Sequence, residues 1–459
     1  MALHKITKGL ELPITGEPEQ AVYDGACPRR VAVVAEDYVG MRPAMGVKVG
    51  DVVARGQVLF EDKKTPGVRY TAPGAGTVVA VNRGERRALQ TVVIALNEGE
   101  RAGETKERDA VSFASYTGKA IAGLAVEEIK ALLVESGLWT ALRGRPFGKV
   151  AHPAAKPHSV FVTAMDTNPL APSPDVVYKG NEEAFANGLI CVARLTEGKT
   201  FLCKAPGAAI TTPAYSGISV EEFAGIHPAG TVGVHIHFLD PVHRDKTVWY
   251  LGYQDVVAIG KLFMTGRLDV TRVVSLAGPG VRKPRLLRTR LGAFLDDLTA
   301  GEMKDGEHRV VSGSVFSGRT AMGEIHGYLG RYHQQVVVLP EDRRREFLGW
   351  LAPGATKFSA INVFASCLNR KKRFDFTTAL HGGRRAMVPI GMYERVMPMD
   401  ILPTFLLRSL IAGDLERAEE LGCLELEEED VSLCTFVSPS KIDYGAVLRK
   451  GLTEIEKEG

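Results

Sequence analysis

The sequence predicts a multidomain α/β protein that also contains β-rich modules, and three observations lead to this fold class. First, 459 residues exceed what one ordinary hydrophobic core organises, so several domains are expected. Second, glycine-punctuated strand patterns fill the N-terminal part of the chain. Third, strand-sized apolar runs alternate with helical periodicity in the middle, and helical patterns dominate the end. We expect four units, over residues 1–110, 111–265, 266–335 and 336–459.

The first unit contains a hairpin pattern. Residues 47–64 (VKVGDVVARGQVLFEDKK) and 71–84 (TAPGAGTVVAVNRG) alternate apolar and polar positions between glycines, which favour turns. The pattern resembles lipoyl and biotinyl carrier domains and predicts a small barrel-sandwich. A carrier presents one lysine at a tight hairpin tip, whereas Lys63 and Lys64 lead into a longer turn at Pro66. We therefore favour a scaffold over a carrier modified on either lysine, and an intact-mass measurement distinguishes the two.

The second unit has α/β patterning. Residues 97–109 (NEGERAGETKERD) are charged and lack apolar periodicity, which predicts a linker. Apolar positions over 126–142 predict helical turns with an interruption near Gly137. Short apolar runs then predict strands with a helix between the first two, so a Rossmann-like domain with parallel strands is expected. The strands are predicted over 159–166 (SVFVTAMD), 189–195 (LICVARL) and 199–205 (KTFLCKA), and the helix over 182–190.

The third and fourth units follow from the remaining patterns. Residues 271–301 read as a strand, a Gly-Pro-Gly turn, a second strand and a helix beginning near Ala293, which is typical of a β-grasp unit. From residue 341 onward helical patterns dominate, including 342–351 (DRRREFLGWL) and 401–422. In the last helix, Leu448, Leu452 and Ile455 share one face. A mainly helical C-terminal domain is expected.

Composition excludes several classes of protein. The net charge is +3, from 57 Lys and Arg against 54 Asp and Glu, which provides no large uniform field for nucleic acid. The longest apolar runs are strand-sized, so no transmembrane helix is expected. The N-terminal residues lack the pattern of an export signal, which favours the cytoplasm. The 6 cysteines are scattered and read as free thiols.

Two patterns raise the question of a metal. In HPAGTVGVHIHFLDPVH (227–243), strand alternation would place His235 and His237 on one face, where two imidazoles are weak candidates for zinc ligands. Packing or hydrogen bonding is the simpler interpretation, because no further ligand set is evident. Cys423 and Cys434 are two thiols without a Cys-x-x-Cys motif, and two ligands alone do not hold an iron–sulfur cluster. We therefore expect no metal on this chain.

Flavin, nucleotide and hydrolase signatures are also weak. SLAGPG (275–280) and TALHGGRR (378–385) supply glycines without the strand–GxGxxG–helix context of a dinucleotide site. SGRT (317–320) and PGAT (353–356) lack the supporting acidic residue of a threonine-linked flavin. No GxSxG nucleophile motif is present, and we expect no catalytic residue and no tightly bound cofactor.

The segment SGLWTALRGRPFGKV (136–150) groups Trp139, Arg143, Arg145 and Phe147. An aromatic ring packs on a quinone and a guanidinium donates to its carbonyl oxygen, so this composition suits a quinone site. The same residue types are common in protein interfaces, which is the simpler interpretation. Both readings stay open at this point.

Several long motifs, in order along nearly the whole chain, resemble the A subunits of the sodium-translocating NADH:quinone oxidoreductases. They include EDYVGMRP (36–43), FVTAMDTNPLAP (161–172), HPAGTVGVHIHFLDPV (227–242), GYQDVVAIGKLFMTG (252–266), MVPIGMYERVMPMDILPT (387–404) and LELEEEDVSLCTFVSPSK (424–441). The resemblance implies a fold related to the flavoprotein subunit of respiratory complex I, with an SLBB-like β-grasp domain. This chain departs from that relative in the flavin loop, which reads AMDTNPLAP, and in the cluster cysteines, of which only Cys434 is kept.

The resemblance also implies a function. It places the chain as a peripheral subunit on the cytoplasmic side of the bacterial inner membrane, in a six-subunit complex that passes electrons from NADH to ubiquinone and exports sodium. NADH, flavins and iron–sulfur clusters would bind partner subunits, and the isolated chain would not be catalytic. Our candidates for ubiquinone contact are Tyr38, Trp139, Arg143 and Phe147. The alternative is a stand-alone flavin-dependent NADH-oxidising protein of the complex I flavoprotein type.

Overall fold

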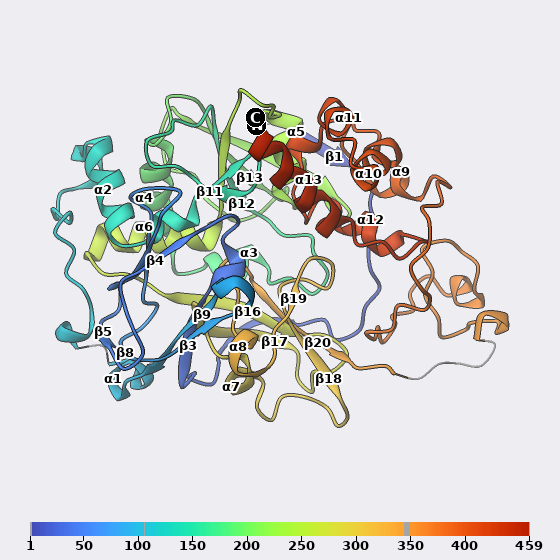
Figure 1. Cartoon of the computed structure of the whole chain (residues 1–459), viewed down its shortest axis with the longest axis horizontal. Coiled ribbons are helices and arrows are strands. Elements are labelled where there is room, and N and C mark those ends of the chain that lie inside the picture. Colours follow the sequence, from blue (N-terminus) through green and yellow to red (C-terminus); the bar gives the residue numbers. More distant parts are fainter. Residues whose placement is uncertain (1, 105, 344–348, 459) are drawn as a thin grey trace.

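The computed structural model describes residues 2–104, 106–343 and 349–458. Within these residues the strands form four sheets, which Figure 1 shows as three regions with helices on the α/β region and at the C-terminal end. The N-terminal barrel lies beside both of the larger sheets.

The N-terminal barrel is a sandwich of two small antiparallel sheets, as expected. Its core contains Leu59, Val78 and Val92, each at 0% exposure. Lys63 and Lys64 are exposed in the connection between β6 and β7. The first sheet has the order β3 (Arg30–Val34), β9 (Leu89–Leu96), β8 (Gly76–Arg83) and β5 (Val52–Val53), and the second has the order β4 (Pro43–Met45), β6 (Val58–Asp62) and β7 (Arg69–Thr71). The predicted linker contains a short helix, α1 (Glu98–Ala102), which Asn97 caps.

The second region is built on a sheet that we call the parallel sheet. Its parallel part runs β1 (Leu3–Ile6), β14 (Ile218–Gly225), β13 (Thr200–Lys204), β12 (Val160–Ala164) and β15 (Val248–Gly252), followed by the antiparallel β10 (Arg143–Arg145) and β11 (Lys149–Val150). Side chains alternate between two covered faces: Val160 and Val162 pack toward α4 (Glu182–Ala193) and α6 (Tyr253–Thr265), and Phe161 packs toward α5 (Val232–Leu239) and the C-terminal helices. This double coverage explains why the strands read as continuous apolar runs.

Helices α4 and α6 cross closely because each has a glycine at the contact. A Cβ on Gly188 would lie 1.9 Å from the Val256 carbonyl oxygen, and one on Gly260 would lie 1.7 Å from that of Ala184. The prediction of a strand over 189–195 is wrong, since most of that run belongs to α4. The predicted interruption near Gly137 is confirmed: α2 (Val126–Glu135) ends before it, and Gly137 has φ 78°. A short helix, α3 (Pro174–Tyr178), follows β12.

The third region contains the expected strand–turn–strand–helix unit within a larger sheet, which we call the grasp sheet. β16 (Thr271–Ala277) and β17 (Arg285–Arg290) are antiparallel, and α7 (Leu295–Thr299) follows. The order is β19 (Arg319–Thr320), β18 (His308–Ser312), β20 (Gln335–Pro340), β16, β17 and β2 (Glu19–Asp24), with α8 (Gly323–His326) after β19. The N-terminal segment therefore supplies one strand to each large sheet, and β20 continues the grasp sheet to residue 340.

In the described part of the C-terminal region the α-helices begin at residue 392, after two short 3-10 helices, Gly349–Leu351 and Ala365–Leu368. Residues 352–391 are mostly irregular, and half of the helix predicted over 342–351, residues 344–348, lies outside the described residues. The expectation of a mainly helical region from 336 is therefore wrong for its first part. The helices are α9 (Met392–Val396), α10 (Pro403–Ala412), α11 (Leu415–Glu420), α12 (Ser432–Val437) and α13 (Tyr444–Glu458). Leu448, Leu452 and Ile455 of α13 are buried, as predicted.

Candidate functional site

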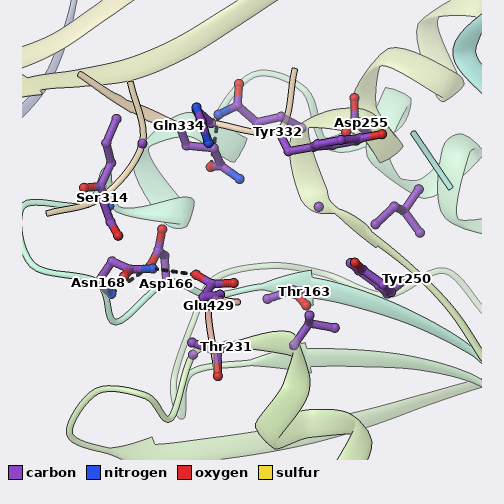
Figure 2. Close-up of a pocket in the computed structure, with 18 of the residues that line it drawn as sticks. Thr163, Asp166, Asn168, Thr231, Tyr250, Asp255, Ser314, Tyr332, Gln334 and Glu429 are labelled. Carbon is purple, nitrogen blue, oxygen red and sulfur yellow. Dashed lines mark hydrogen bonds between the residues drawn. The ribbon is translucent and has the colours of Figure 1, made fainter. Parts of the chain in front are cut away.

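A polar cavity of about 150 Å³ lies where the parallel sheet meets the grasp sheet. It opens at the carboxyl ends of β12 and β15, which is where open α/β sheets place ligands. Loops around β18 and β20 form the opposite wall (Figure 2). Its lining includes Arg143, Thr163, Asp166, Asn168, Thr231, Tyr250, Gln254, Asp255, Ser314, Arg331, Tyr332, Gln334, Gln335 and Glu429. The residues come from widely separated stretches of the chain.

Arg143 lies between two tyrosine rings. Its guanidinium carbon is 4.5 Å from the ring centre of Tyr250 and 4.1 Å from that of Tyr332. Burial lowers the pKa of Arg143, but the neighbouring groups, Tyr250 and Glu427 first among them, outweigh this effect. The net pKa is raised, so the guanidinium stays charged. The Arg143 Nε atom is buried and has no hydrogen-bond partner in the described part of the chain. The rings block both faces of the guanidinium, so a ligand reaches this donor only at its edge.

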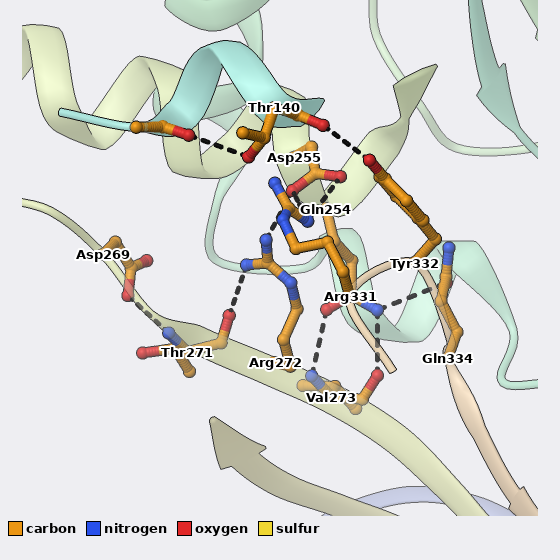
Figure 3. Close-up of polar contacts among 11 residues, drawn as sticks. Thr140, Gln254, Asp255, Asp269, Thr271, Arg272, Val273, Arg331, Tyr332 and Gln334 are labelled. Carbon is orange, nitrogen blue, oxygen red and sulfur yellow. Dashed lines mark hydrogen bonds and ion pairs between the residues drawn. The ribbon is translucent and has the colours of Figure 1, made fainter. Parts of the chain in front are cut away.

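A rigid ionic wall stands next to Tyr332 (Figure 3). Arg331 donates to both carboxylate oxygens of Asp255, at 2.9 and 3.2 Å, and Arg272 donates to the same group at 2.5 Å. Burial raises the pKa of Asp255, but the two arginines outweigh it and hold this pKa below its usual value. Tyr332 donates its hydroxyl to the Thr140 carbonyl at 2.8 Å. The wall therefore fixes Tyr332, and with it one side of Arg143.

Two carboxyl groups on another side of the cavity, Asp166 and Glu429, have raised pKa values, whereas that of Asp255 is lowered. Asn168 donates its side-chain amide to Asp166 at 3.0 Å and to Glu429 at 3.2 Å. Burial raises the pKa of Asp166 to about 6, although hydrogen bonds from Asn168 oppose it. Burial, with the charges of Asp430 and Asp166, raises the pKa of Glu429 to about 7. Near neutral pH this side of the cavity both accepts and donates protons.

Several buried polar atoms of the lining are without a hydrogen-bond partner among the described residues. They include the donors Arg143 Nε and Arg331 Nη2, the acceptors Asn168 Oδ1 and Gln335 Oε1, and the Thr163 hydroxyl, which can donate or accept. Unpaired buried polar atoms cost free energy, so native structures rarely leave them without a ligand or water. The set suits a small molecule with acceptor oxygens.

The four residues predicted for quinone contact do not converge on one cavity. Arg143 lines the polar cavity described above. Tyr38 lines a separate small cavity of about 50 Å³, and its ring packs edge-on against Tyr332, with the two ring centres 6.2 Å apart. Trp139 is fully buried, packs against Trp249 and donates its N–H to the Ala151 carbonyl at 2.7 Å. Phe147 packs with the core shared by α5 and the C-terminal helices, at a backbone φ of 82°.

The two histidines considered as zinc ligands lie on a helix, so the expectation of a shared strand face is wrong. Successive helical positions turn by about 100°, which points His235 and His237 of α5 in nearly opposite directions. His235 is buried with Nε2 3.0 Å from the Ala229 carbonyl, and His237 pairs with Glu425 at 2.9 Å. In the described ranges, no group of three or more His, Cys, Asp or Glu side chains is placed to hold a metal ion. All 6 cysteines are free thiols.

Sequence reasoning missed Tyr250, Arg331, Tyr332 and the acidic pair. Asp166 had a usable signal, because it directly follows the predicted strand over 159–166 and so falls at the carboxyl end of a parallel strand. The others carry no local signal, since tyrosine and arginine beside a strand occur equally well in a core or on a surface.

Comparisons with known proteins decide the family. The description "NqrA N-terminal barrel-sandwich hybrid domain" matches residues 4–97, "NqrA second alpha/beta domain" matches 124–268, and "NQRA C-terminal domain" matches 273–323. The NqrA subunit of the Na(+)-translocating NADH-quinone reductase from Pasteurella multocida is 57% identical over 454 residues, which cover 99% of each chain. The chain belongs to the NqrA family. The corresponding protein from Cellvibrio japonicus is 56% identical, over 99% of this chain and 100% of its own.

Two further findings complete the comparison. A solved structure of an NAD+-reducing NiFe-hydrogenase in the H2-reduced state is 15% identical with a TM-score of 0.39, over 75% of this chain and 63% of its own. Among the described residues of this member of the NqrA family, none of the helices has the length and apolar character needed to span a membrane.

Proposed function

We propose that the chain works as the NqrA component of a six-subunit Na+-translocating NADH:ubiquinone reductase, peripheral on the cytoplasmic side of the bacterial inner membrane. Identity of 57% to an NqrA protein over the whole length supports this role. NADH, flavins and iron–sulfur clusters bind the partner subunits, and the isolated chain is not catalytic. Its contacts are with the membrane subunits of the complex and with ubiquinone.

The ubiquinone headgroup binds in the polar cavity. A cavity of about 150 Å³ admits one unsubstituted six-membered ring, as the benzene-binding cavity of that size shows, so the methoxy and methyl groups and the isoprenoid chain of ubiquinone lie toward its opening. Quinone carbonyl oxygens are acceptors, and Arg143 Nε and Arg331 Nη2 are charged donors of the lining that are buried without a partner among the described residues. These two unpaired donors are the observation that carries the proposal.

Tyr38 and Trp139 are connected to this site indirectly, through Tyr332 and Thr140. Tyr38 packs edge-on against Tyr332, and Tyr332 covers one face of Arg143. Trp139 belongs to the short turn that contains Thr140, whose carbonyl accepts from Tyr332. Only Arg143 of the four predicted residues contacts the headgroup, and Phe147 lies outside the lining.

Titration of the purified chain with a short-chain ubiquinone, followed by tryptophan fluorescence, tests the site. Arg143→Lys keeps the charge but removes the planar guanidinium and Nε, so we expect Kd to rise about tenfold or more, since a hydrogen bond to a charged group contributes about 1.5–3 kcal/mol. Arg244→Lys is the matched control, because Arg244 is exposed and pairs with Glu419 away from the lining. Trp139→Ala is a poor test, since it empties a fully buried position.

Two outcomes overturn the proposal. Absence of saturable quenching, or an equal loss in Arg143→Lys and Arg244→Lys, removes the quinone from this cavity. Stoichiometric flavin in the absorption spectrum together with NADH oxidation by the isolated chain supports the stand-alone flavoprotein instead.

A further inference from the structure

Residues 361–390 form an exposed segment with an unusual charge. The segment contains six Arg and Lys residues and one Asp, a net charge of +5 in a chain whose total is +3. In Figure 1 it belongs to the orange loops that extend from one side of the molecule, away from the sheets. We call it the basic–apolar segment.

The segment is anchored from within. Phe374 and Phe376 pack with Phe358 and Phe436 in a cluster of aromatic rings. The Phe374 backbone N–H donates to the Pro13 carbonyl at 2.8 Å, and the Phe374 carbonyl accepts from the Thr15 N–H at 3.0 Å. The outward side chains are therefore presented by a backbone that the rest of the protein holds in place.

Large apolar side chains of the segment point to solvent. Leu368 is 88% exposed, Leu380 68%, Val363 62% and Ile390 58%. Ile361 and Val388 of the same segment are also exposed, at 38% and 37%, so six large apolar side chains of this segment reach solvent. Single exposed apolar side chains are ordinary, but six of them in one short basic segment favour a partner surface.

The cations beside them are free. Arg370, Lys371, Arg384 and Arg385 are exposed, and none has an ion-pair partner in the part of the chain that the structure describes. Arg385 lies near Lys441, whose pKa is lowered first by burial and then by that neighbouring charge. The segment therefore presents uncompensated positive charge.

We propose that the basic–apolar segment binds the anionic lipid headgroups of the membrane. Cations interleaved with single apolar side chains suit this surface, because the cations reach phosphates while the apolar groups enter the acyl boundary. The core of a protein interface is instead depleted of charge. The irregular backbone stays at headgroup level, where water satisfies its polar groups. The inference rests on the membrane location proposed above and is independent of quinone binding.

Co-sedimentation of the purified full chain with vesicles tests the proposal. At low ionic strength we expect binding to vesicles of phosphatidylglycerol and phosphatidylcholine in equal amounts, and none to phosphatidylcholine alone. Replacing Arg370, Lys371, Arg384 and Arg385 by Gln lowers the partition coefficient by more than about a hundredfold, from about fivefold per cation near an anionic surface. Leu368→Ser with Leu380→Ser weakens binding without changing its dependence on salt.

The matched control replaces four exposed cations of the N-terminal barrel, Lys63, Lys64, Arg86 and Arg87, by Gln. The control retains vesicle binding, and unchanged thermal unfolding shows that all variants are folded.

An equal loss of vesicle binding in the control variant shows diffuse electrostatic attraction and overturns the proposal. Absence of vesicle binding, with loss of assembly onto the other subunits in the segment variant, assigns the segment to a protein partner and also overturns it. Quinone titration of the same variants stays at the wild-type affinity whatever the lipid result.

Discussion

Single carboxyl groups around the cavity are held in opposite electrostatic states. Asp255 lies between Arg331 and Arg272, which outweigh its burial and keep it ionised. Asp166 and Glu429 are placed against an amide and against other acids, so burial dominates and raises their pKa values to about 6 and about 7. One wall of the cavity is thus fixed in charge, and the other changes its charge near neutral pH.

The Glu429 carboxyl makes stability depend on pH. Its pKa in the folded state, about 7, lies above the ordinary 4.5, so its favourable contribution is complete below pH 4.5 and is lost as pH rises through 7. Glu429→Gln removes this loss. We expect the variant to be more stable than the wild type by about 1–2 kcal/mol at about pH 8 and equal to it at about pH 4, since water in the cavity screens the charge.

Urea unfolding of both proteins across this pH range measures the difference. The buried histidines, such as His227 with a pKa lowered by burial to about 4, oppose folding in acid but are common to both chains and cancel. A difference in unfolding free energy that does not vary with pH would contradict the assignment.

At the scale of single elements, sequence patterns identified strands and helices except where burial was complete. Residues 159–166 and 199–205 contain parallel strands, and the last helix has the predicted buried face. The apolar run over 189–195 was read as a strand but is mostly helix α4, because a short apolar run looks the same in both when every side is covered. Complete burial also explains why helix α5 was not predicted. Val232 to Ile236 are all buried, so the sequence around His235 shows no helical period.

The crossing of α4 and α6 depends on Gly260. A Cβ at this position meets the Ala184 backbone oxygen at 1.7 Å, and a backbone atom cannot move aside as a flexible side chain does. We expect Gly260→Ala to separate the helices and destabilise the protein by about 2–4 kcal/mol. Thermal and urea unfolding measure this change.

Gly123→Ala is the control for the helix crossing, because nothing lies within 4 Å of a Cβ built on Gly123. There the added methyl leaves stability unchanged or raises it slightly by restricting the unfolded chain. Equal effects of the two substitutions would show that close approach is not what selects glycine at 260.

On the scale of the whole molecule, the cavity exists only because separate units assemble. Arg143, Asp166, Tyr250, Tyr332 and Glu429 come from widely spaced parts of the chain. The sequence predicts the barrel, the parallel strands and the grasp unit, since each has a local period or turn signal. It does not predict which loops meet, because that depends on how the units pack. Of the four residues predicted for quinone contact, Arg143 alone lines the polar cavity. It does so because its strand, β10, lies where the parallel sheet meets the grasp sheet.

The C-terminal helices are joined to the parallel sheet by a buried ionic cluster. Arg145 is 1% exposed, and its guanidinium lies 2.7 Å from Asp430 and 3.3 Å from Glu427. Tyr250 donates its hydroxyl to Glu427 from the neighbouring strand β15. The cluster connects two strands to the segment that precedes α12, so it holds the Glu429 side of the cavity in place.

Arg145→Met leaves Glu427 and Asp430 buried without their main partner. Removing one member of a buried pair costs about 3–5 kcal/mol, whereas replacing the whole cluster by neutral groups costs much less. We therefore expect Arg145→Met to be strongly destabilised, with limited proteolysis cutting first between the sheet and the C-terminal helices. The triple variant with Glu427→Gln and Asp430→Asn should recover part of the loss, because neither carboxylate then stays charged without Arg145, while Arg143 loses its ion pair with Glu427. A triple variant less stable than Arg145→Met would show that the cluster acts through packing, and that its charges do not decide how the C-terminal helices dock.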